Sequence, residues 1–287
     1  MQHKFHKIYI ELTNICGLEC SFCPTKDTQT PKTIPLQRFK NLIEQIKPFT
    51  KVIALHIFGD PLTLKNLKDY INVISKSNLK VEITTTGFFL KKHSLDLFLE
   101  PSIRQVNFSL NSFAKNEPKI TIDEYLEPIF ALCDLKLEKK IHNFINLRLW
   151  NQDENNSEEE FNSLVFKKLF NKFKVKIENK TYSQPIRLEN QILLHFDNYF
   201  EWPSLQNKHL SHGFCHGLSA QLGILSDGTV VPCCLDGFGV INLGNILEIP
   251  LVEILNSTRA NNIIKGFQDK IAVEELCQKC SFKDRFL

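Results

Sequence analysis

The sequence predicts an α/β fold, a partial (β/α)6 TIM-like barrel with a small C-terminal Cys-rich β-hairpin/helix module. Strand-like apolar runs alternate with helix-like stretches about six times, at intervals of roughly 30 residues, as parallel βαβ units require. Six such units are fewer than the eight that close a TIM barrel, so we expect the barrel to be open. From residue 213 the pattern changes, and five of the nine cysteines follow.

Strands are predicted where apolar residues are dense or alternate, and helices where they recur every three to four positions. The expected strands are 7–12, 52–58, 80–86, 104–110, 144–150 and 174–178. The expected helices are 36–47, 64–76, a short one at 93–99, 122–137 and 161–173. Pro35 and Pro48 bracket the first helix, and Pro128 predicts a kink in the fourth. These elements assign residues 1–180 to the barrel.

A break in the pattern predicts a linker over 181–212. This stretch holds Pro185, Pro203 and a run of aromatic residues from 196 to 202. Core packing is the favoured interpretation of those aromatics, and a substrate-pocket wall is the alternative. Residues 213–287 are assigned to a second module, in which Asp227-Gly228 between alternating apolar residues predicts a β-hairpin.

Composition and charge restrict the class of protein. Hydrophobic residues make up 43% and charged residues 23% of the 287 positions, which is typical of a globular chain. No apolar run reaches the ~18 residues of a membrane span, and the N-terminal stretch lacks the features of a signal peptide. We therefore expect a cytoplasmic protein without membrane contact. A net charge of +3 gives no indication of nucleic-acid binding.

The first cysteine group follows the first predicted strand. Cys16, Cys20 and Cys23 have the spacing C-x3-C-x2-C. In a reducing compartment such clustered cysteines are metal ligands rather than disulfides. A closed zinc site needs four ligands, whereas three thiolates on a [4Fe–4S] cluster leave one iron open. A structural metal knuckle is the alternative.

This triplet, with Phe22 at the aromatic position, resembles the C-x3-C-x-aromatic-C signature of the radical S-adenosylmethionine (radical SAM) superfamily. Gly59-Asp60-Pro61, at the end of the second strand, resembles the G-G-E-P motif of that superfamily, although Phe58 and Asp60 depart from it. The resemblance implies that backbone groups of this turn bind the methionine amino group of S-adenosylmethionine.

Two further strand ends extend the resemblance over residues 5–180. Thr85-Thr86-Gly87 stands where the family often has T-N-G, and Ser109-Leu110-Asn111 where it often has S-L-D. The resemblance implies that Thr86 and Ser109 lie in the cofactor site, with Ser109 on the ribose or carboxylate. Arg148, which interrupts the apolar fifth strand, is our candidate partner for the carboxylate. For Ser109 and Arg148, a solvated or salt-bridged barrel residue is the alternative.

The second cysteine group resembles the opening of a SPASM module, in the shortened form called twitch. Cys215, Gly228 and Cys233 follow C-x12-G-x4-C, and Cys277 and Cys280 complete four thiolates. The resemblance implies one auxiliary [4Fe–4S] cluster with these four ligands. A zinc ribbon is the alternative, and Cys234 is a possible substitute for Cys233. His212 and His216 are interpreted as loop residues, and Cys133 as a core residue.

The implied chemistry is radical. Family resemblance implies that S-adenosylmethionine is cleaved reductively to a 5′-deoxyadenosyl radical, which takes hydrogen from a substrate. The auxiliary cluster would accept the remaining electron, and Asp236 is a candidate base, with a turn residue as the alternative. Oxidation or cleavage of a small molecule, nucleoside or modified base is favoured over modification of a peptide or protein, and a metal-stabilised binding protein is a further alternative. We expect an electron donor such as flavodoxin or ferredoxin.

Overall fold

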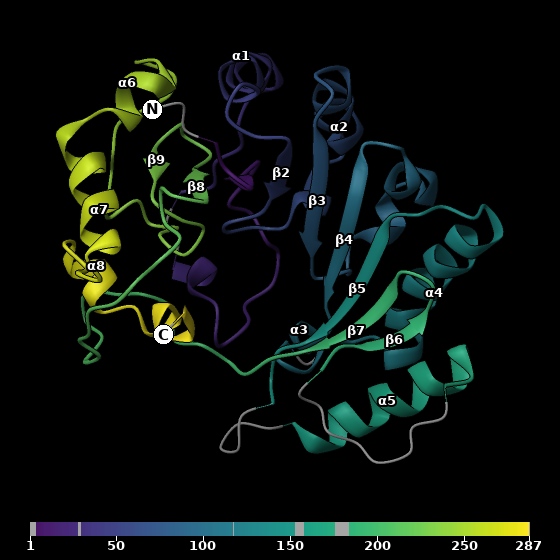
Figure 1. The fold of residues 1–287 in the computed structure, drawn as a ribbon. Coiled ribbons are helices and arrows are strands. Elements are labelled where there is room, and N and C mark those ends of the chain that lie inside the picture. Colours follow the sequence, from purple (N-terminus) through teal and green to yellow (C-terminus); the bar gives the residue numbers. More distant parts are fainter. Residues whose placement is uncertain (1–3, 28–29, 117, 153–157, 176–183, 287) are drawn as a thin grey trace. The chain divides into compact units, whose positions relative to one another are not determined.

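A computed structural model describes the chain except residues 1–3, 28–29, 117, 153–157, 176–183 and 287 (Figure 1). The contacts divide it into two compact units. The first unit comprises Met1–Gly17, Cys23–Val81 and Phe200–Leu287, and the second comprises Leu18–Phe22 and Glu82–Tyr199. Each unit is described by itself.

The first unit contains a mixed sheet with strand order β2-β1-β8-β9. Strand β1 (Lys7–Ile10) runs parallel to both of its neighbours, so that Ile8 faces Ile53 on one side and Leu222 on the other. The other strands are β2 (Val52–Leu55), β8 (Gln221–Ile224) and β9 (Val230–Val231). Strands β8 and β9 are antiparallel and confirm the hairpin predicted around Asp227-Gly228.

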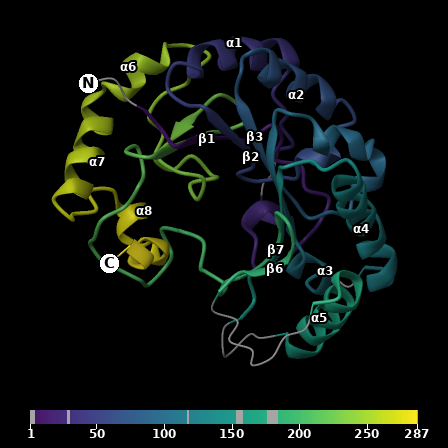
Figure 2. The same cartoon turned by 45° about the vertical axis from the view of Figure 1, so that its right-hand side comes forward.

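Helices cover this sheet. Helix α1 (Leu36–Ile46) buries Phe39, Leu42, Ile43 and Ile46, which recur at helical spacing, and Figure 2 shows α1 and α2 outside β1 and β2. The other helices of the unit are α2 (Leu67–Lys76), α6 (Leu251–Leu255), α7 (Thr258–Gln268), α8 (Glu275–Gln278) and the 3-10 helices η1 (Pro24–Asp27), η2 (Pro61–Thr63) and η5 (Ser281–Phe286).

The second unit carries the strand order β6-β7-β5-β4-β3. Strands β4 (Ile103–Ser109), β5 (Phe144–Leu149) and β7 (Ile192–Phe196) are parallel, and β6 (Ile186–Glu189) pairs antiparallel with β7 at the edge. Strand β3 (Lys80–Thr85) enters this unit from the first. The helices are α3 (Asn111–Ala114), α4 (Ile122–Glu138), α5 (Glu159–Phe173), η3 (Leu90–Lys92) and η4 (Leu95–Leu99).

The predicted fold class is confirmed, because parallel strands alternate with helices and neither strand series closes on itself. The first five predicted strands are present, whereas the sixth is not where we expected it. Lys174, its predicted first residue, ends helix α5 in a left-handed conformation, and residues 176–178 lie outside the described part. The predicted linker instead contains the hairpin β6–β7, whose second strand joins β5 in parallel. The ILLHF strand is short, so its signal was lost among its polar neighbours.

Candidate cofactor and substrate site

The loop that carries the cysteine triplet is fastened at its base. Thr13 Oγ1 donates to the carbonyl of Lys32 at 2.9 Å, and Asn14 Nδ2 donates to the carbonyl of Thr30 at 2.9 Å. Lys32 N donates back to Asn14 Oδ1 at 2.7 Å. These bonds fix the two residues that lead from β1 into Cys16. Cys16 and Cys23 are partly exposed.

Cys20 belongs to the second unit and is 6% exposed. Asn116 Nδ2 donates to Cys20 Sγ at 2.9 Å, and Asn116 Oδ1 accepts from Glu19 N at 2.8 Å. One amide therefore orients both the thiol and the backbone beside it, and a hydrogen bond to a cysteine sulfur tunes a cluster that the sulfur binds. Phe22 lies against Tyr199 with ring centroids 5.1 Å apart. No motif marks Asn116, so sequence reasoning missed it.

The Gly59-Asp60-Pro61 turn lies directly on the cysteine loop. Gly59 has φ +68°, and a Cβ there would lie 2.1 Å from the carbonyl oxygen of Thr13. Asp60 N donates to the carbonyl of Ile15 at 3.0 Å, so the turn is hydrogen-bonded to the residue before Cys16. The Asp60 carboxylate is buried and accepts from Leu62 N at 2.9 Å, which caps the 3-10 turn that starts at Pro61. The motif thus presents backbone groups next to the first cysteine.

The second unit places a row of polar residues across three adjacent strands. Ser109 on β4 pairs in register with Arg148 on β5, which pairs with His195 on β7. The Arg148 guanidinium lies 4.8 Å from the centre of the Trp150 ring. Burial and then the positive charge of Arg148 lower the pKa of His195. His195 was not among the predicted site residues, because it lies within 181–212, which we predicted to be a linker rather than a strand.

Thr86 follows β3 at the edge of the same unit. Its carbonyl accepts a hydrogen bond from the Tyr125 hydroxyl at 2.6 Å, and the next residue, Gly87, has φ +86°. Thr85 Oγ1 accepts from Gly87 N at 3.0 Å and closes this turn. The three consecutive residues therefore form a tight strand end, as the Thr-Thr-Gly sequence predicts.

The C-terminal cysteines that were predicted to bind a cluster all belong to the first unit and are partly buried: Cys215, Cys233, Cys277 and Cys280. Burial raises the pKa of each of them, and the charge of neighbouring thiols adds to this effect at Cys215, Cys233 and Cys277. Cys215 interacts electrostatically with Cys233, Cys277 and Cys280. In the described residues, no three His, Cys, Asp or Glu side chains form a group suited to a single metal ion.

Cys233 and Cys234 have different surroundings. Cys233 interacts with Cys215 and Cys277, whereas Cys234 bonds to the Tyr9 hydroxyl and packs against the core cluster of Ile57, Leu225 and Val231. Burial raises the pKa of Cys234 to about 11. These surroundings favour Cys233 as the ligand. Cys133 is fully buried on α4, in agreement with its interpretation as a core residue.

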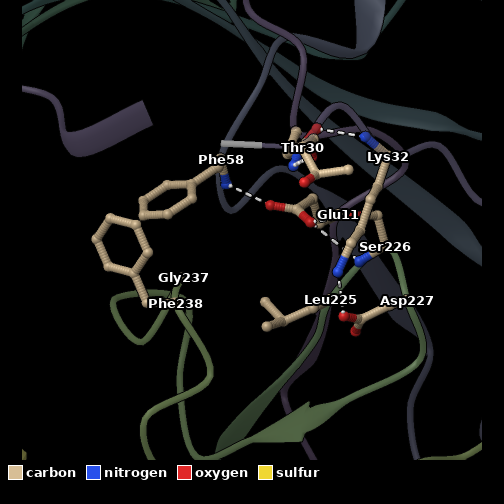
Figure 3. A pocket seen from close by; sticks show the side chains of 10 residues that line it. Glu11, Thr30, Lys32, Phe58, Leu225, Ser226, Asp227, Gly237 and Phe238 are labelled. Atoms are coloured by element: carbon tan, nitrogen blue, oxygen red, sulfur yellow. Dashed lines mark hydrogen bonds and ion pairs between the residues drawn. The ribbon is translucent and has the colours of Figure 1, made fainter. Parts of the chain in front are cut away.

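A cavity of about 370 Å³ lies in the first unit next to the Gly59 turn (Figure 3). Phe58 and Phe238 form an aromatic wall, with ring centroids 5.0 Å apart. Glu11 forms the polar floor and is 3% exposed. An ion pair between Lys32 Nζ and Asp227 Oδ2, at 2.8 Å, lies at the side. The complete lining is Glu11, Asn14, Thr30, Lys32, Phe58, Leu225, Ser226, Asp227, Gly237 and Phe238.

Glu11 connects two segments that line this cavity, one at Phe58 and one at Ser226. Its Oε1 accepts from Phe58 N at 3.2 Å, and its Oε2 accepts from Ser226 N at 2.9 Å and Ser226 Oγ at 2.6 Å. Burial raises the pKa of Glu11 although these three donors lower it. A charged residue between Ile10 and Leu12 is the only sequence signal for Glu11, which is not among the predicted site residues.

Asp236 directly precedes Gly237, a residue of the cavity lining. Its two carboxylate oxygens accept from Val240 N and Ile241 N, each at 2.8 Å, and burial raises its pKa. Both oxygens therefore support the loop that follows Cys233, which matches the turn-residue alternative. Its role as a base stays a prediction.

Comparisons with known families decide what this arrangement is. A family model described as the radical SAM superfamily matches residues 10–158, slightly more than half of the chain. The chain belongs to the radical SAM superfamily. A second model, SPASM, described as an iron–sulfur cluster-binding domain, matches residues 215–281. Both predicted resemblances are confirmed, and together the two domains imply S-adenosylmethionine, an iron–sulfur cluster and an auxiliary cluster.

Curated relatives of this radical SAM chain include enzymes of two kinds. GTP 3′,8-cyclase of Campylobacter jejuni subsp. doylei is 30% identical over 164 residues, covering 53% of this chain and 50% of the relative. The S-adenosyl-L-methionine-dependent 2-deoxy-scyllo-inosamine dehydrogenase of Niallia circulans is 25% identical over 130 residues, covering 43% of this chain and 52% of the relative. The chain thus spans about half the length of the curated relatives it matches.

Solved structures support the fold. BtrN in complex with AdoMet and 2-DOIA matches 98% of this chain and 94% of its own, with a TM-score of 0.57 and 16% identity. Streptococcus suis SuiB bound to the precursor peptide SuiA matches 99% of this chain and 73% of its own, with a TM-score of 0.58 and 13% identity. These radical SAM folds therefore include one complex with a small molecule and one with a peptide. Across the described residues of the present chain, no helix has the length and apolarity of a membrane span.

The side chains present fit the implied groups. Three thiolates on a [4Fe–4S] cluster leave one iron open, and the bond from Asp60 N to the Ile15 carbonyl puts the Gly59 turn beside the residue that precedes Cys16. Burial and the charge of neighbouring thiols both raise the pKa of Cys233 and Cys277. A positively charged iron–sulfur core compensates such a set of donors.

Proposed function

We propose that the chain is a radical SAM enzyme that oxidises a small polar molecule. When bound, the cofactors supply a 5′-deoxyadenosyl radical and an electron acceptor. Cys16, Cys20 and Cys23 hold the first cluster, and Cys215, Cys233, Cys277 and Cys280 hold the auxiliary cluster. Backbone groups of Gly59, Asp60 and Pro61 bind the methionine moiety. Thr86, Ser109 and Arg148 contribute to the rest of the S-adenosylmethionine site, with Phe22 beside the cluster.

The cavity of the first unit is the observation that carries this proposal. Its volume lies within the range of small-molecule sites, at about 300–1,000 Å³. The aromatic wall combines Phe58, which precedes the proposed S-adenosylmethionine turn, with Gly237-Phe238, which follows the proposed ligand Cys233. A substrate bound here is next to both functional segments of the unit.

The lining suggests the class of substrate. Two phenyl rings offer an apolar face, whereas Glu11, Asn14 and Asp227 offer acceptors for hydroxyl or amino groups. A hydroxylated or aminated ring, such as a cyclitol, sugar or nucleoside, satisfies both. The net reaction is a two-electron oxidation. One hydrogen atom would go to the 5′-deoxyadenosyl radical, one proton to a base, for which Asp236 is the candidate, and one electron to the auxiliary cluster held by the four C-terminal cysteines.

A peptide substrate is the second candidate. Phe238 at the cavity wall is 53% exposed, and the nearby Val240 is also exposed, so an apolar surface extends beyond the cavity. Such a surface suits a chain that reaches the cavity with one side chain. The first electron comes from a donor such as flavodoxin or ferredoxin in either case, and we retain the cytoplasm as the proposed compartment.

The experiment starts with anaerobic reconstitution and a count of iron and sulfide. Dithionite and S-adenosylmethionine are then added, with and without pools of cyclitols, sugars, nucleosides and short peptides, and 5′-deoxyadenosine is followed by chromatography. We expect two clusters, and deoxyadenosine that rises with one small-molecule pool together with a product two hydrogens lighter. A rise with the peptide pool alone favours the second candidate. A folded protein without iron or deoxyadenosine refutes the enzyme proposal and leaves a metal-stabilised binding protein.

A further inference from the structure

Lys283 is a buried lysine beside the four C-terminal thiols. It lies in η5, three positions after Cys280, and is only 2% exposed. Its Nζ donates to the carbonyl of Cys280 at 2.8 Å and to the carbonyl of Gln278 at 3.2 Å. A lysine is almost never buried to this degree unless its charge is paired. The burial of this ammonium group therefore needs an explanation.

Carboxylate pairing is a weak explanation. The nearest carboxylate oxygen, Asp284 Oδ1, is 3.8 Å from Lys283 Nζ, beyond hydrogen-bond distance. The same oxygen accepts from Ser211 Oγ at 3.0 Å, and the other oxygen of Asp284 lies 3.0 Å from His209 Nε2. Asp284 thus has partners of its own, and the ammonium group bonds to carbonyls of the Cys277–Cys280 turn.

The charge of Lys283 acts on the thiols. It favours the thiolate forms of Cys215 and Cys280, which belong to different segments of the chain. Asp236 and Glu274 act with the opposite sign on Cys277. Asp284 also opposes Lys283 at Cys280, but Lys283 Nζ is the buried cation that bonds directly to the backbone of this cysteine, at 2.8 Å from its carbonyl oxygen.

We propose that Lys283 raises the reduction potential of the auxiliary centre and so makes it a better electron acceptor. This inference rests on the proposed function, in which four thiolates hold an iron–sulfur cluster. Each electron taken from the substrate radical adds one negative charge to the buried site, while the substrate loses that electron and one proton. A fixed positive charge in a poorly solvated site stabilises the more negative state. Lys283 is a tuning residue and is not part of the lining of the proposed substrate cavity.

A purely structural role is the competing explanation, because lysines stabilise helix C-termini by bonding to terminal carbonyls. Three substitutions separate the two roles. Lys283→Met removes the charge and keeps most of the volume, Lys283→Gln removes the charge and keeps an amide donor, and Lys283→Arg keeps the charge. Lys279→Met is the matched control, since Lys279 lies in the same turn but pairs with Glu275 at 3.2 Å.

The full chain with Cys16, Cys20 and Cys23 replaced by alanine isolates the auxiliary centre for an EPR-monitored redox titration. We expect Lys283→Met and Lys283→Gln to shift the midpoint to lower potential, and Lys283→Arg and Lys279→Met to leave it near that of the parent. An unchanged midpoint in an iron-loaded Met or Gln variant overturns the proposal. Loss of iron from Lys283→Arg as well as from both neutral variants overturns it in favour of a structural role.

The iron and sulfide content of the parent separates this proposal from the one on which it rests. If the parent contains zinc or no metal at the four thiols, the proposed auxiliary centre fails, and the tuning role fails with it. If the parent contains the cluster and the midpoint does not respond to the charge at position 283, only the tuning role fails.

Discussion

Substitution of Gly59 by alanine tests the contact between the proposed S-adenosylmethionine turn and the cysteine loop. A Cβ at Gly59 would lie 2.1 Å from the Thr13 carbonyl oxygen and 2.8 Å from the Asn14 carbonyl carbon, so backbone has to move. Gly239 is a matched control because it has the same φ, +68°, whereas its Cβ would meet only the side chains of Leu225 at 3.1 Å and Thr229 at 3.6 Å.

The two variants share one cost and differ in another. A left-handed conformation costs an alanine about 1–2 kcal/mol, and this applies to both glycines. Overpacking against atoms that cannot turn aside adds about 1–3 kcal/mol, and this applies to Gly59 alone. We therefore expect Gly239→Ala to lower the free energy of unfolding by about 1–2 kcal/mol and Gly59→Ala by about 2–5 kcal/mol. Because Thr13 and Asn14 lead into Cys16, their displacement also weakens S-adenosylmethionine binding, by about tenfold or more, which corresponds to about 1.4 kcal/mol.

Urea unfolding gives the stability difference, and anaerobic equilibrium dialysis with labelled S-adenosylmethionine gives the binding difference. Iron content is measured on the same samples, so that loss of the cluster is distinguished from loss of the ligand. Equal losses in Gly59→Ala and Gly239→Ala would refute the proposed clash, since only the left-handed cost would then matter. Unchanged affinity in a destabilised Gly59→Ala variant would separate the turn from the cofactor site.

Three further predictions follow from the site. Replacing Cys16, Cys20 and Cys23 together by alanine lowers iron from about eight to about four atoms per chain and abolishes deoxyadenosine, as iron analysis and chromatography will show; full iron retention would contradict this. Arg148→Met weakens S-adenosylmethionine binding by about 10- to 100-fold, at about 1.5–3 kcal/mol for a lost charged hydrogen bond, with iron unchanged; equilibrium dialysis measures this, and an unchanged affinity removes Arg148 from the site. Burial raises the pKa of Glu11 above 4.5 in the folded protein. The protonated carboxyl therefore contributes to the free energy of unfolding, fully so below pH 4.5. This contribution is lost as the pH rises through the pKa of the folded state. Urea unfolding across this range should show that Glu11→Gln lacks that decline, whereas parallel curves would contradict it.

The sequence was sufficient to predict those candidate site residues whose spacing lies within one segment of the chain. Two motifs are continuous in the sequence and stand at strand ends: the triplet Cys16, Cys20 and Cys23, and the turn at Gly59. They can therefore be recognised without a structure. Asn116, which bonds to Cys20 Sγ, could not be predicted, because a side-chain contact between distant segments leaves no local pattern. His195 was missed for another reason. Its strand is the second, five-residue strand of a hairpin, in a stretch that proline and aromatic residues marked as irregular.

The cavity depends on a pair of residues from the two matched domains. Phe58 stands where the related motif has glycine, and a Cβ at Gly237 would lie 2.4 Å from Cζ of the Phe58 ring. The large residue in the radical SAM part therefore requires the small one in the SPASM part. Glu11 bonds to the backbone of Phe58 and of Ser226, so the same two segments are also joined through one buried carboxylate. Because shape and hydrogen bonding both couple these segments, a substitution at Phe58 acts on the loop after Cys233 as well as on the Gly59 turn. Both segments line the cavity, so such a substitution also changes its shape.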